Sequence, residues 1–379
     1  MKSLELFSGC GGLAKGLELA GFDHCAFVEF NKRACESLRA NFAPSLVHEV
    51  DIRAFDFNSV GNVDLIAGGP PCQPFSLGGL SRAYEDSRDM FPQAIRAIHE
   101  LTPRGFIFEN VKGLLRKSFS DYFEYIVLRL TFPERILPVG MDWRAHLAEL
   151  RTIDFPAYAG LKYDVQYRLL NAVDYGVPQS RERVFIVGLR HDLGLEWEWP
   201  AKAVHRMTIA DAIGRLPDAR CANELGDHVF IDGAREYPGH TGSDYNKPSK
   251  TIKAGAHGVP GGENMIRFPD GSLRYMTVHE AKLIQSFPDS YRICGSWGEA
   301  LRQIGNAVPV RLAQVLGEKM RKTLDATNRT GVRRTAHAVT PATRRAVSPA
   351  TRASHGDVDL DRQAMTRTGD ASASVSRRA

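Results

Sequence analysis

The chain has 379 residues, of which 43% are apolar and 25% charged, as is usual for a globular protein with one large core and a smaller domain or tail. No apolar run is long enough for a membrane-spanning helix, and the six cysteines form neither a CxxC pair nor a cluster at metal-ligand spacing. Composition therefore argues against membrane proteins and disulfide scaffolds. It predicts a protein of the reducing cytoplasm, without a membrane partner and without a metal.

The net charge of +5 is distributed unevenly along the chain. Residues 326–379 hold ten Arg, no Lys and four Asp, whereas the other 325 residues hold 39 basic and 40 acidic side chains. Bulk charge outside the tail thus gives no support for nucleic-acid binding. The tail has almost no large apolar residue, so we expect it to be disordered. A tail that strengthens non-specific DNA binding and a tail without function remain equally open.

Strands and helices alternate along the first part of the chain. Strands are predicted at residues 3–7, 25–28, 46–50, 63–67 and 106–108. Helices are predicted between them, at residues 12–20, 32–41 and 90–101. Further strands at 165–170 and 183–187 extend the same sheet. Because this alternation is typical of βαβ units, it predicts an α/β, Rossmann-like fold with a mostly parallel sheet.

The pattern changes near residue 195. Residues 195–274 are rich in Gly, Pro and Asp, and helical periodicity returns only at 277–286 and 308–324. We therefore expect a main domain of residues 1–194 and 302–325, a small loop-rich domain of residues 195–301, and a disordered basic tail of residues 326–379. Residues 131–161 receive no role from the sequence.

A glycine-rich turn, Ser8-Gly9-Cys10-Gly11-Gly12, follows the first predicted strand. Glycines at such a junction let the backbone turn tightly and approach a ligand. Glu29 ends the second strand, where a nucleotide-like ligand needs a partner for its ribose. The chain has no G-x-G-x-x-G and no G-K-[ST], which favours an adenosine-containing ligand without phosphate over NAD or ATP. A purely structural turn is the alternative.

Cysteine, glutamate and arginine follow or begin the strands of the predicted sheet. Cys72 stands in Gly68-Gly69-Pro70-Pro71-Cys72-Gln73-Pro74-Phe75-Ser76, a stiff loop that suits a nucleophile, although a buried structural cysteine is the commoner case. Glu109 follows the strand 106–108 and, beside a thiol, is a candidate proton donor rather than a simple cap. Arg181 and Arg183 share one face at a strand start and are expected to point into the same cleft.

Together these motifs resemble those of bacterial DNA cytosine-5 methyltransferases. The matching segments cover most of residues 1–320, and they are Phe7-Ser8-Gly9-Cys10-Gly11-Gly12, Pro70–Ser76, Glu109-Asn110-Val111, Gln179-Ser180-Arg181-Glu182-Arg183 and Gln303–Pro309. The resemblance implies transfer of a methyl group from S-adenosyl-L-methionine to carbon 5 of a cytosine flipped out of a specific double-stranded DNA sequence. It also implies a bacterial, nucleoid-associated monomer that is either the modification enzyme of a restriction–modification system or an orphan methylase.

The resemblance assigns roles residue by residue. Cys72 adds to carbon 6 of the cytosine, Glu109 protonates its nitrogen 3, and Arg183 holds its O2. Arg181 supports the same pocket or a nearby phosphate. The implied cofactor-binding residues are Phe7, Gly9, Gly11, Gly12, Glu29, Asp51, Ile52, Pro71, Met90 and Asn306.

In the same reading, residues 195–301 form the target-recognition domain, and Leu77–Arg82 form a lid over the extruded base. One alternative is a tRNA cytosine methyltransferase, but the Cys-Phe-Thr element of those relatives is absent here. The other is an inactive DNA-binding relative, which the intact Cys72, Glu109 and Arg183 argue against. The recognised DNA sequence does not follow from the chain.

Overall fold

The computed structural model describes residues 1–331, except 72–88, 222, 237, 239–240 and 255–263. All described residues belong to one compact unit of the chain, Met1–Thr335. Within them, no helix is both long and apolar enough to cross a lipid bilayer. The predicted lid at Leu77–Arg82 and most of the predicted tail lie outside the described residues.

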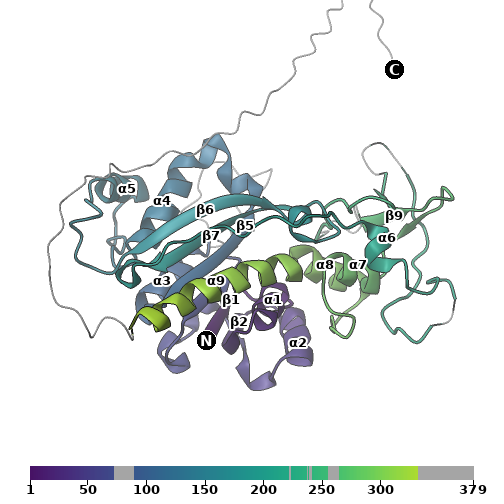
Figure 1. Ribbon diagram of the computed structural model, residues 1–379, viewed down its shortest axis with the longest axis horizontal. Coiled ribbons are helices and arrows are strands. Elements are labelled where there is room, and N and C mark those ends of the chain that lie inside the picture. Colours follow the sequence, from purple (N-terminus) through teal and green to yellow (C-terminus); the bar gives the residue numbers. More distant parts are fainter. Residues whose placement is uncertain (72–88, 222, 237, 239–240, 255–263, 332–379) are drawn as a thin grey trace, which may run out of the picture. The chain divides into compact units, whose positions relative to one another are not determined.

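A seven-stranded sheet in the order β3-β2-β1-β4-β5-β7-β6 forms the centre of the fold (Figure 1). Its strands are β1 (Lys2–Leu6), β2 (Asp23–Glu29), β3 (Val47–Glu49), β4 (Leu65–Gly68), β5 (Gly105–Val111), β6 (Tyr163–Asn171) and β7 (Glu182–Arg190). The first five are parallel, whereas β7 is antiparallel to both β5 and β6. The mostly parallel, Rossmann-like α/β prediction is confirmed. Strand order reverses between β1 and β4, which is where such sheets bind ligands.

Helices cover both faces of this sheet. They are α1 (Gly12–Leu19), α2 (Lys32–Asn41), α3 (Phe91–Leu101), α4 (Ser120–Thr131), α5 (Trp143–Arg151) and α9 (Val310–Gly331). The other helices, α6 (Ile209–Ile213), α7 (Val278–Ile284) and α8 (Trp297–Asn306), pack together in the loop-rich part of the chain. Side chains of α3, α4 and α5 share one apolar core with Ile66, and those of α1 and α9 share another with Leu65 and Ala67. These neighbouring β4 residues alternate between two buried faces, as expected for a strand covered on both sides.

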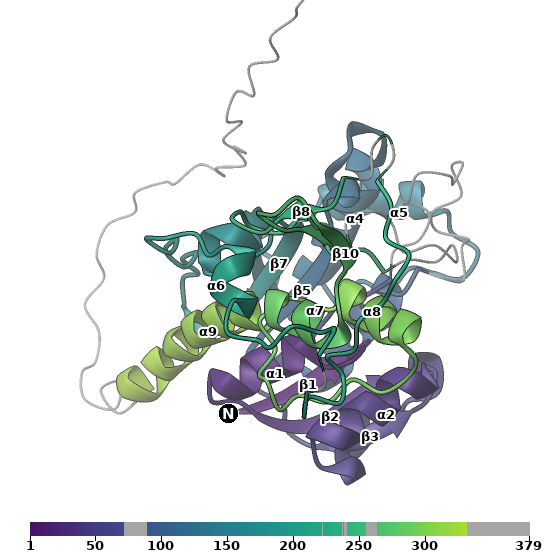
Figure 2. The same cartoon turned by 90° about the vertical axis from the view of Figure 1, so that its right-hand side faces the viewer.

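A small three-stranded sheet, in the order β10-β9-β8, lies in the loop-rich part of the chain. Its strands are β8 (Ser243–Asp244), β9 (Met265–Arg267) and β10 (Leu273–Tyr275). Side chains of α6, α7 and α8 form a separate apolar core with Ile252, Ile266 and Met276. Figure 2 shows this sheet and these helices from the side on which they lie. Arg274 and Glu280 form a buried ion pair here, which supports a structural role for both.

Three long helices, α4, α5 and α8, were not predicted from the sequence. The helix expected at 308–324 begins at Val310 and continues to Gly331, so the predicted tail boundary at residue 326 falls inside α9. Helix α8 crosses the predicted domain boundary at 301/302, and its Leu301 and Ile304 pack into the core of the small sheet. The division into catalytic and target-recognition domains therefore stays a proposal.

The segment without a predicted role, residues 131–161, forms an outer layer on α4. The Trp143 ring of α5 lies 5.2 Å from the ring of Tyr122, edge to face. His146 Nδ1 lies 3.0 Å from the Tyr125 hydroxyl, and the Arg151 guanidinium pairs with acidic side chains of α4. The segment is thus fixed to the face of the main sheet that α4 covers.

Candidate active site

A cavity of about 740 Å³ opens where the parallel strands end. Its size is usual for a small-molecule site. Residues at or just after the ends of β1, β2, β4 and β5 contribute to its lining, because the carboxyl ends of parallel strands meet at one edge of the sheet. Of the predicted cofactor-binding residues, those that line it are Phe7, Gly9, Gly12, Glu29, Asp51, Ile52, Pro71, Met90 and Asn306.

The turn after β1 has the unusual backbone that its glycines allow. Phe7 and Gly9 both have φ of 53°, and Gly11 has φ of 86°. Gly12 needs its missing side chain, because a Cβ there would lie 2.3 Å from the carbonyl oxygen of Val308. Gly11 instead faces Tyr291, whose hydroxyl would lie 2.4 Å from a Cβ at position 11. Of the four predicted turn residues, Gly11 therefore contacts protein rather than the cavity.

Glu29 ties the glycine turn to the start of α2. One carboxylate oxygen accepts the N–H of Gly9 at 2.8 Å, and the other accepts those of Phe30 at 3.0 Å and Asn31 at 2.8 Å. Burial raises the pKa of Glu29, while these three N–H donors act in the opposite direction. A carboxylate oxygen offers more than one lone pair, so Glu29 can still accept a hydroxyl from the cavity.

The residues around the undescribed segment 72–88 are joined. The N–H of Met90 donates to the carbonyl of Pro71 at 3.1 Å, which brings the two flanks of the segment together at the cavity. Cys72 itself lies outside the described residues, but Pro71 directly precedes it. The position of the thiol therefore stays a prediction.

Glu109 and Arg183 meet at the end of the cavity that Pro71 lines. Arg183 Nε lies 2.8 Å from Glu109 Oε1, without the angle of a hydrogen bond. Glu109 is 8% exposed, and its Oε2 would lie 3.4 Å from a Cβ added to Gly69. The neighbouring Asn110 donates to the carbonyl of Pro70 at 2.9 Å. The acid and the arginine thus lie directly above the backbone that leads to Cys72.

Arg181 differs from Arg183 in its surroundings. Its side chain is 1% exposed and donates to the carbonyls of Ile252 at 3.2 Å and Gly305 at 2.8 Å. Burial lowers the pKa of Arg181 to about 9, so the guanidinium is still protonated at neutral pH. Both arginines line the cavity, as the sequence predicted, but only Arg183 pairs with Glu109.

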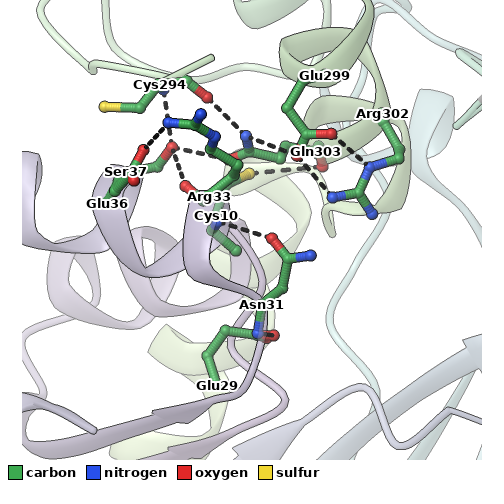
Figure 3. A network of polar contacts seen from close by, with 11 residues as sticks. Cys10, Glu29, Asn31, Arg33, Glu36, Ser37, Cys294, Glu299, Arg302 and Gln303 are labelled. Carbon is green, nitrogen blue, oxygen red and sulfur yellow. Dashed lines mark hydrogen bonds and ion pairs between the residues drawn. The ribbon is translucent and has the colours of Figure 1, made fainter. Parts of the chain in front are cut away.

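A polar network behind the glycine turn joins α2 to α8 (Figure 3). The Ser37 hydroxyl donates to the side chain of Gln303 at 2.7 Å and accepts the N–H of Cys294 at 2.8 Å. Gln303 also donates to the carbonyl of Cys294 at 2.7 Å, and the Cys10 thiol lies 3.5 Å from the Gln303 carbonyl. The network fixes α8, and with it Asn306, beside the turn.

Sequence reasoning left several lining residues unassigned, among them Phe30, Asn31 and Arg302. Phe30 is 72% exposed although aromatic, and Arg302 pairs with Glu299. An aromatic residue directly after Glu29 and a cation directly before Gln303 were the available signals. Within the described part of the chain, no group of three or more His, Cys, Asp or Glu side chains could hold a metal ion.

The fold and the cavity define an α/β methyltransferase of Rossmann-like type. A family model described as C-5 cytosine-specific DNA methylase matches residues 1–132 and 157–322. The chain therefore belongs to the C-5 cytosine-specific DNA methylases, which methylate carbon 5 of cytosine in DNA. The unmatched residues 133–156 include α5 and fall inside the segment to which the sequence gave no role.

Curated relatives extend over nearly the same length. The chain is 33% identical over 339 residues to the type II methyltransferase M.NgoMIV of Neisseria gonorrhoeae, covering 86% of this chain and 99% of the relative. It is also 33% identical over 339 residues to the type II methyltransferase M.AplI of Arthrospira platensis, covering 85% of this chain and 86% of the relative.

Solved structures show the same fold. The Entamoeba histolytica methyltransferase EhMeth matches with a TM-score of 0.61 at 15% identity, covering 86% of this chain and 98% of that one. A variant of Spodoptera frugiperda DNMT2 matches with a TM-score of 0.56 at 20% identity, covering 84% and 99%. At these identities the likeness concerns the fold alone.

Proposed function

We propose that this chain methylates cytosine within one specific double-stranded DNA sequence, with S-adenosyl-L-methionine as methyl donor. The observation that carries the proposal is the Glu109–Arg183 pair, placed over Gly69 in the cavity that Glu29 also lines. Its relatives M.NgoMIV and M.AplI are named type II methyltransferases, which supports a role in a restriction–modification system. An orphan methylase with the same chemistry is the second form of this proposal.

The reaction needs a covalent step because carbon 5 of cytosine is a poor nucleophile. The Cys72 thiolate adds to carbon 6 while Glu109 donates a proton to nitrogen 3, so that the electron pair of the carbon 5–carbon 6 bond becomes available at carbon 5. Carbon 5 then takes the methyl group, and the donor leaves as a neutral thioether. A base removes the proton from carbon 5, the carbon 5–carbon 6 double bond re-forms as the thiolate leaves, and Glu109 takes back the proton from nitrogen 3. Cytosine must first be flipped out of the duplex, at a cost of a few kcal/mol.

The two arginines have different roles beside the reacting groups. Arg183 keeps Glu109 in place and, as a fixed donor, holds the cytosine O2. Arg181 supports the same pocket. Its burial and its two carbonyl partners favour this supporting role over contact with a phosphate.

The cavity lining fits S-adenosyl-L-methionine, which supplies an electrophilic methyl group on a sulfonium. Glu29 is placed to accept the ribose hydroxyls, and Ile52 and Phe30 offer apolar surface to the adenine. Arg53 donates to the carboxylate of Asp51, and both residues line the cavity. The Arg53 cation is therefore paired. Phe7, Gly9 and Gly12 hold the methionine end, together with Pro71, Met90 and Asn306, and Gly11 shapes the turn from behind.

Residues 195–301 provide DNA recognition in this proposal, and residues 1–194 with 302–325 provide catalysis. The small sheet and its helices carry many polar loop residues that suit phosphate and base contacts. We place the enzyme in the bacterial cytoplasm, bound to the nucleoid through DNA and acting as a monomer, without a metal.

The test uses purified full-length protein with labelled S-adenosyl-L-methionine and either unmethylated genomic DNA or tRNA. Label in DNA, with methylcytosine at one recurring sequence by bisulfite sequencing, is the expected result. Label in tRNA alone would defeat the proposal in favour of the tRNA enzyme. The Cys72→Ser variant should bind DNA and transfer no methyl group, and unchanged transfer by this variant would defeat the assigned mechanism.

A further inference from the structure

A buried polar junction joins the start of β7 to the small domain. The Ser180 N–H donates to the carbonyl of Ser249 at 2.8 Å, and the Ser249 N–H donates to that of Pro178 at 2.8 Å. The Thr251 hydroxyl donates to the carbonyl of Ser180 at 2.8 Å. Gln179 and Ser249 form an isolated parallel bridge. The residues before β7 and the segment 249–252 are therefore fixed side by side.

Two fully buried glutamines extend this junction to α8. Gln179 accepts the N–H of Ile252 at 3.1 Å and donates to the side-chain oxygen of Gln285 at 2.9 Å. Gln285 in turn donates to the carbonyls of Ile304 at 2.7 Å and Ala307 at 3.1 Å. Because both glutamines are 0% exposed, each contact replaces a bond to water that the fold has removed.

Arg181 makes the most direct connection of all. Its guanidinium donates with one nitrogen to Ile252 of the small domain and with another to Gly305 of α8. Gly305 directly precedes Asn306, which lines the cavity. A Cβ at position 305 would lie 2.5 Å from the nitrogen of Ala254, so α8 meets this segment backbone to backbone. One side chain thus holds the small domain and the cofactor side of the cavity together.

The segment is also held directly after Ile252. The side chain of Asn264 accepts the N–H of Lys253 at 3.0 Å and donates to its carbonyl at 3.1 Å, across eleven positions of the chain. Asn264 is 1% exposed, and its own carbonyl accepts the N–H of Met276. Asn264 therefore connects the segment that Arg181 holds to the small sheet.

We propose that Arg181 is a positioning residue that aligns the DNA-reading domain with the cofactor pocket, acting through the carbonyls of Ile252 and Gly305. The proposal rests on the proposed function, because it takes the cavity as the cofactor site and the small domain as the DNA reader. Two residues further on, Arg183 pairs with Glu109, so the start of β7 connects both of these parts to the reacting groups. Arg181 contacts neither the cytosine nor a phosphate.

The first test is Arg181→Lys, measured on the full chain. Lysine keeps the charge but lacks the planar fork, so one ammonium group cannot reach both carbonyls. We expect KM for S-adenosyl-L-methionine and KM for unmethylated genomic DNA each to rise about tenfold, because a tenfold change corresponds to the loss of one buried hydrogen bond. The change in kcat should be smaller than the change in either KM. Arg190→Lys is the matched control, because Arg190 donates to the carbonyl of Thr102 at 2.7 Å at the far end of β7. It should leave both constants unchanged.

A second variant, Gln179→Met, keeps the shape of the junction and removes the acceptor for Ile252. This variant should also raise KM for DNA. It tests the positioning role of the junction if Arg181→Lys fails to fold. A fall in kcat with both KM values unchanged would overturn the proposal, since Arg181 would then act on the base itself. A rise in KM for DNA alone after Arg181→Lys would overturn it in favour of a phosphate contact.

Calorimetric binding of S-adenosyl-L-methionine, measured without turnover, separates this proposal from the proposed function. Weaker binding by Arg181→Lys than by Arg190→Lys supports the junction even in a preparation that transfers no methyl group. Equal binding by wild type and Arg181→Lys counts against the junction, whereas methyl transfer by the wild type would still support the proposed function.

Discussion

The carboxylate of Glu109 and the guanidinium of Arg183 face each other from antiparallel strands, with Oε1 and Nε 2.8 Å apart. In the register of β5 and β7, Val111 is opposite Arg183 and Glu109 is opposite Phe185, so the pair is diagonal on one face of the sheet. Strand pairing, rather than a flexible loop, therefore sets the distance between the Glu109 carboxylate and the Arg183 guanidinium. Such rigidity suits two side chains that must each be held against one atom of a substrate.

Glu109→Gln keeps the size of the side chain and removes the transferable proton. We expect the rate of methyl transfer to fall by about a hundredfold or more, as is usual when a general acid is lost. Glu182→Gln is the matched control, because Glu182 directly precedes Arg183, has a side chain that is 43% exposed and, among the residues that the structure describes, pairs with Lys112 at 2.9 Å. Single-turnover rates at saturating cofactor compare the two variants, and an equal loss in both would contradict the role given to Glu109.

Gly12→Ala places a methyl group against a backbone atom that cannot move aside, the carbonyl oxygen of Val308. We expect a loss of about 1–3 kcal/mol in the free energy of unfolding, together with weaker cofactor binding. Gly298→Ala in α8 is the control, because nothing lies within 4 Å of a Cβ there. That change should leave stability equal or slightly higher, since alanine favours helix. Urea unfolding curves of both variants and the wild type provide the measurement. A Gly12→Ala variant as stable as the wild type would refute the close packing of Gly12 against Val308.

Trp143→Ala tests whether the segment that the family model does not match supports the fold. Trp143 is 8% exposed and packs on Tyr122, whose hydroxyl donates to Asp89 beside Met90. We expect a loss of about 3–5 kcal/mol in stability, as for other buried aromatic residues cut back to alanine. Ile136→Ala, at a side chain that is 64% exposed, should cost little. Similar melting temperatures for both variants would show that α5 contributes no stability.

Glu5 predicts a dependence of stability on pH. It is 1% exposed, and burial raises its pKa to about 8, while burial lowers that of the neighbouring His24 to about 4, so His24 is neutral at pH 7. The folded protein binds the carboxyl proton more tightly than the unfolded chain does. The stability is therefore fully present below about pH 4.5 and is lost as the pH rises toward 8, by at most about 1.4 kcal/mol per pH unit.

Glu5→Gln should remove this dependence. The amide stays neutral at every pH, so the variant should unfold at higher urea concentration than the wild type at pH 8 and at nearly the same concentration at pH 4.5. Parallel urea curves at pH 4.5, 6 and 8 provide the measurement. An identical pH profile in both proteins would mean that burial does not raise the pKa of Glu5 above its ordinary value in the folded state.

Motifs and strand order together predicted most of this site. Phe7, Glu29 and Pro71 follow or end a strand of the parallel sheet, and Glu109, which was expected just after its strand, lies two residues before the end of β5 at the same edge. Local patterns could not place Gly11 against Tyr291, because that contact joins residues far apart in the chain. The carbonyl partners of Arg181 could not be predicted for the same reason, because Ile252 and Gly305 belong to other parts of the sequence.

The unpredicted helices have a different explanation. In α4 the buried face is aromatic and includes Tyr122 and Tyr125, residues with modest helix propensity whose place is decided by packing on Trp143. In α8 the Gly298 and Gly305 positions weaken the local helical signal. Gly305 is nevertheless required, because the backbone of Ala254 takes up the space of its side chain. Tertiary packing overrides local preference in both helices.

The close approach of Gly12 to Val308 has a consequence for synthesis. The turn that is translated among the first residues meets its packing partner only after nearly three hundred further residues have left the ribosome. A nascent chain can pair β1 with β2 early, but it cannot complete the cavity until the region of α8 and α9 has emerged. Methyl transfer should therefore begin only after the region of α8 and α9 has been translated, which keeps chains without this region from modifying the genome.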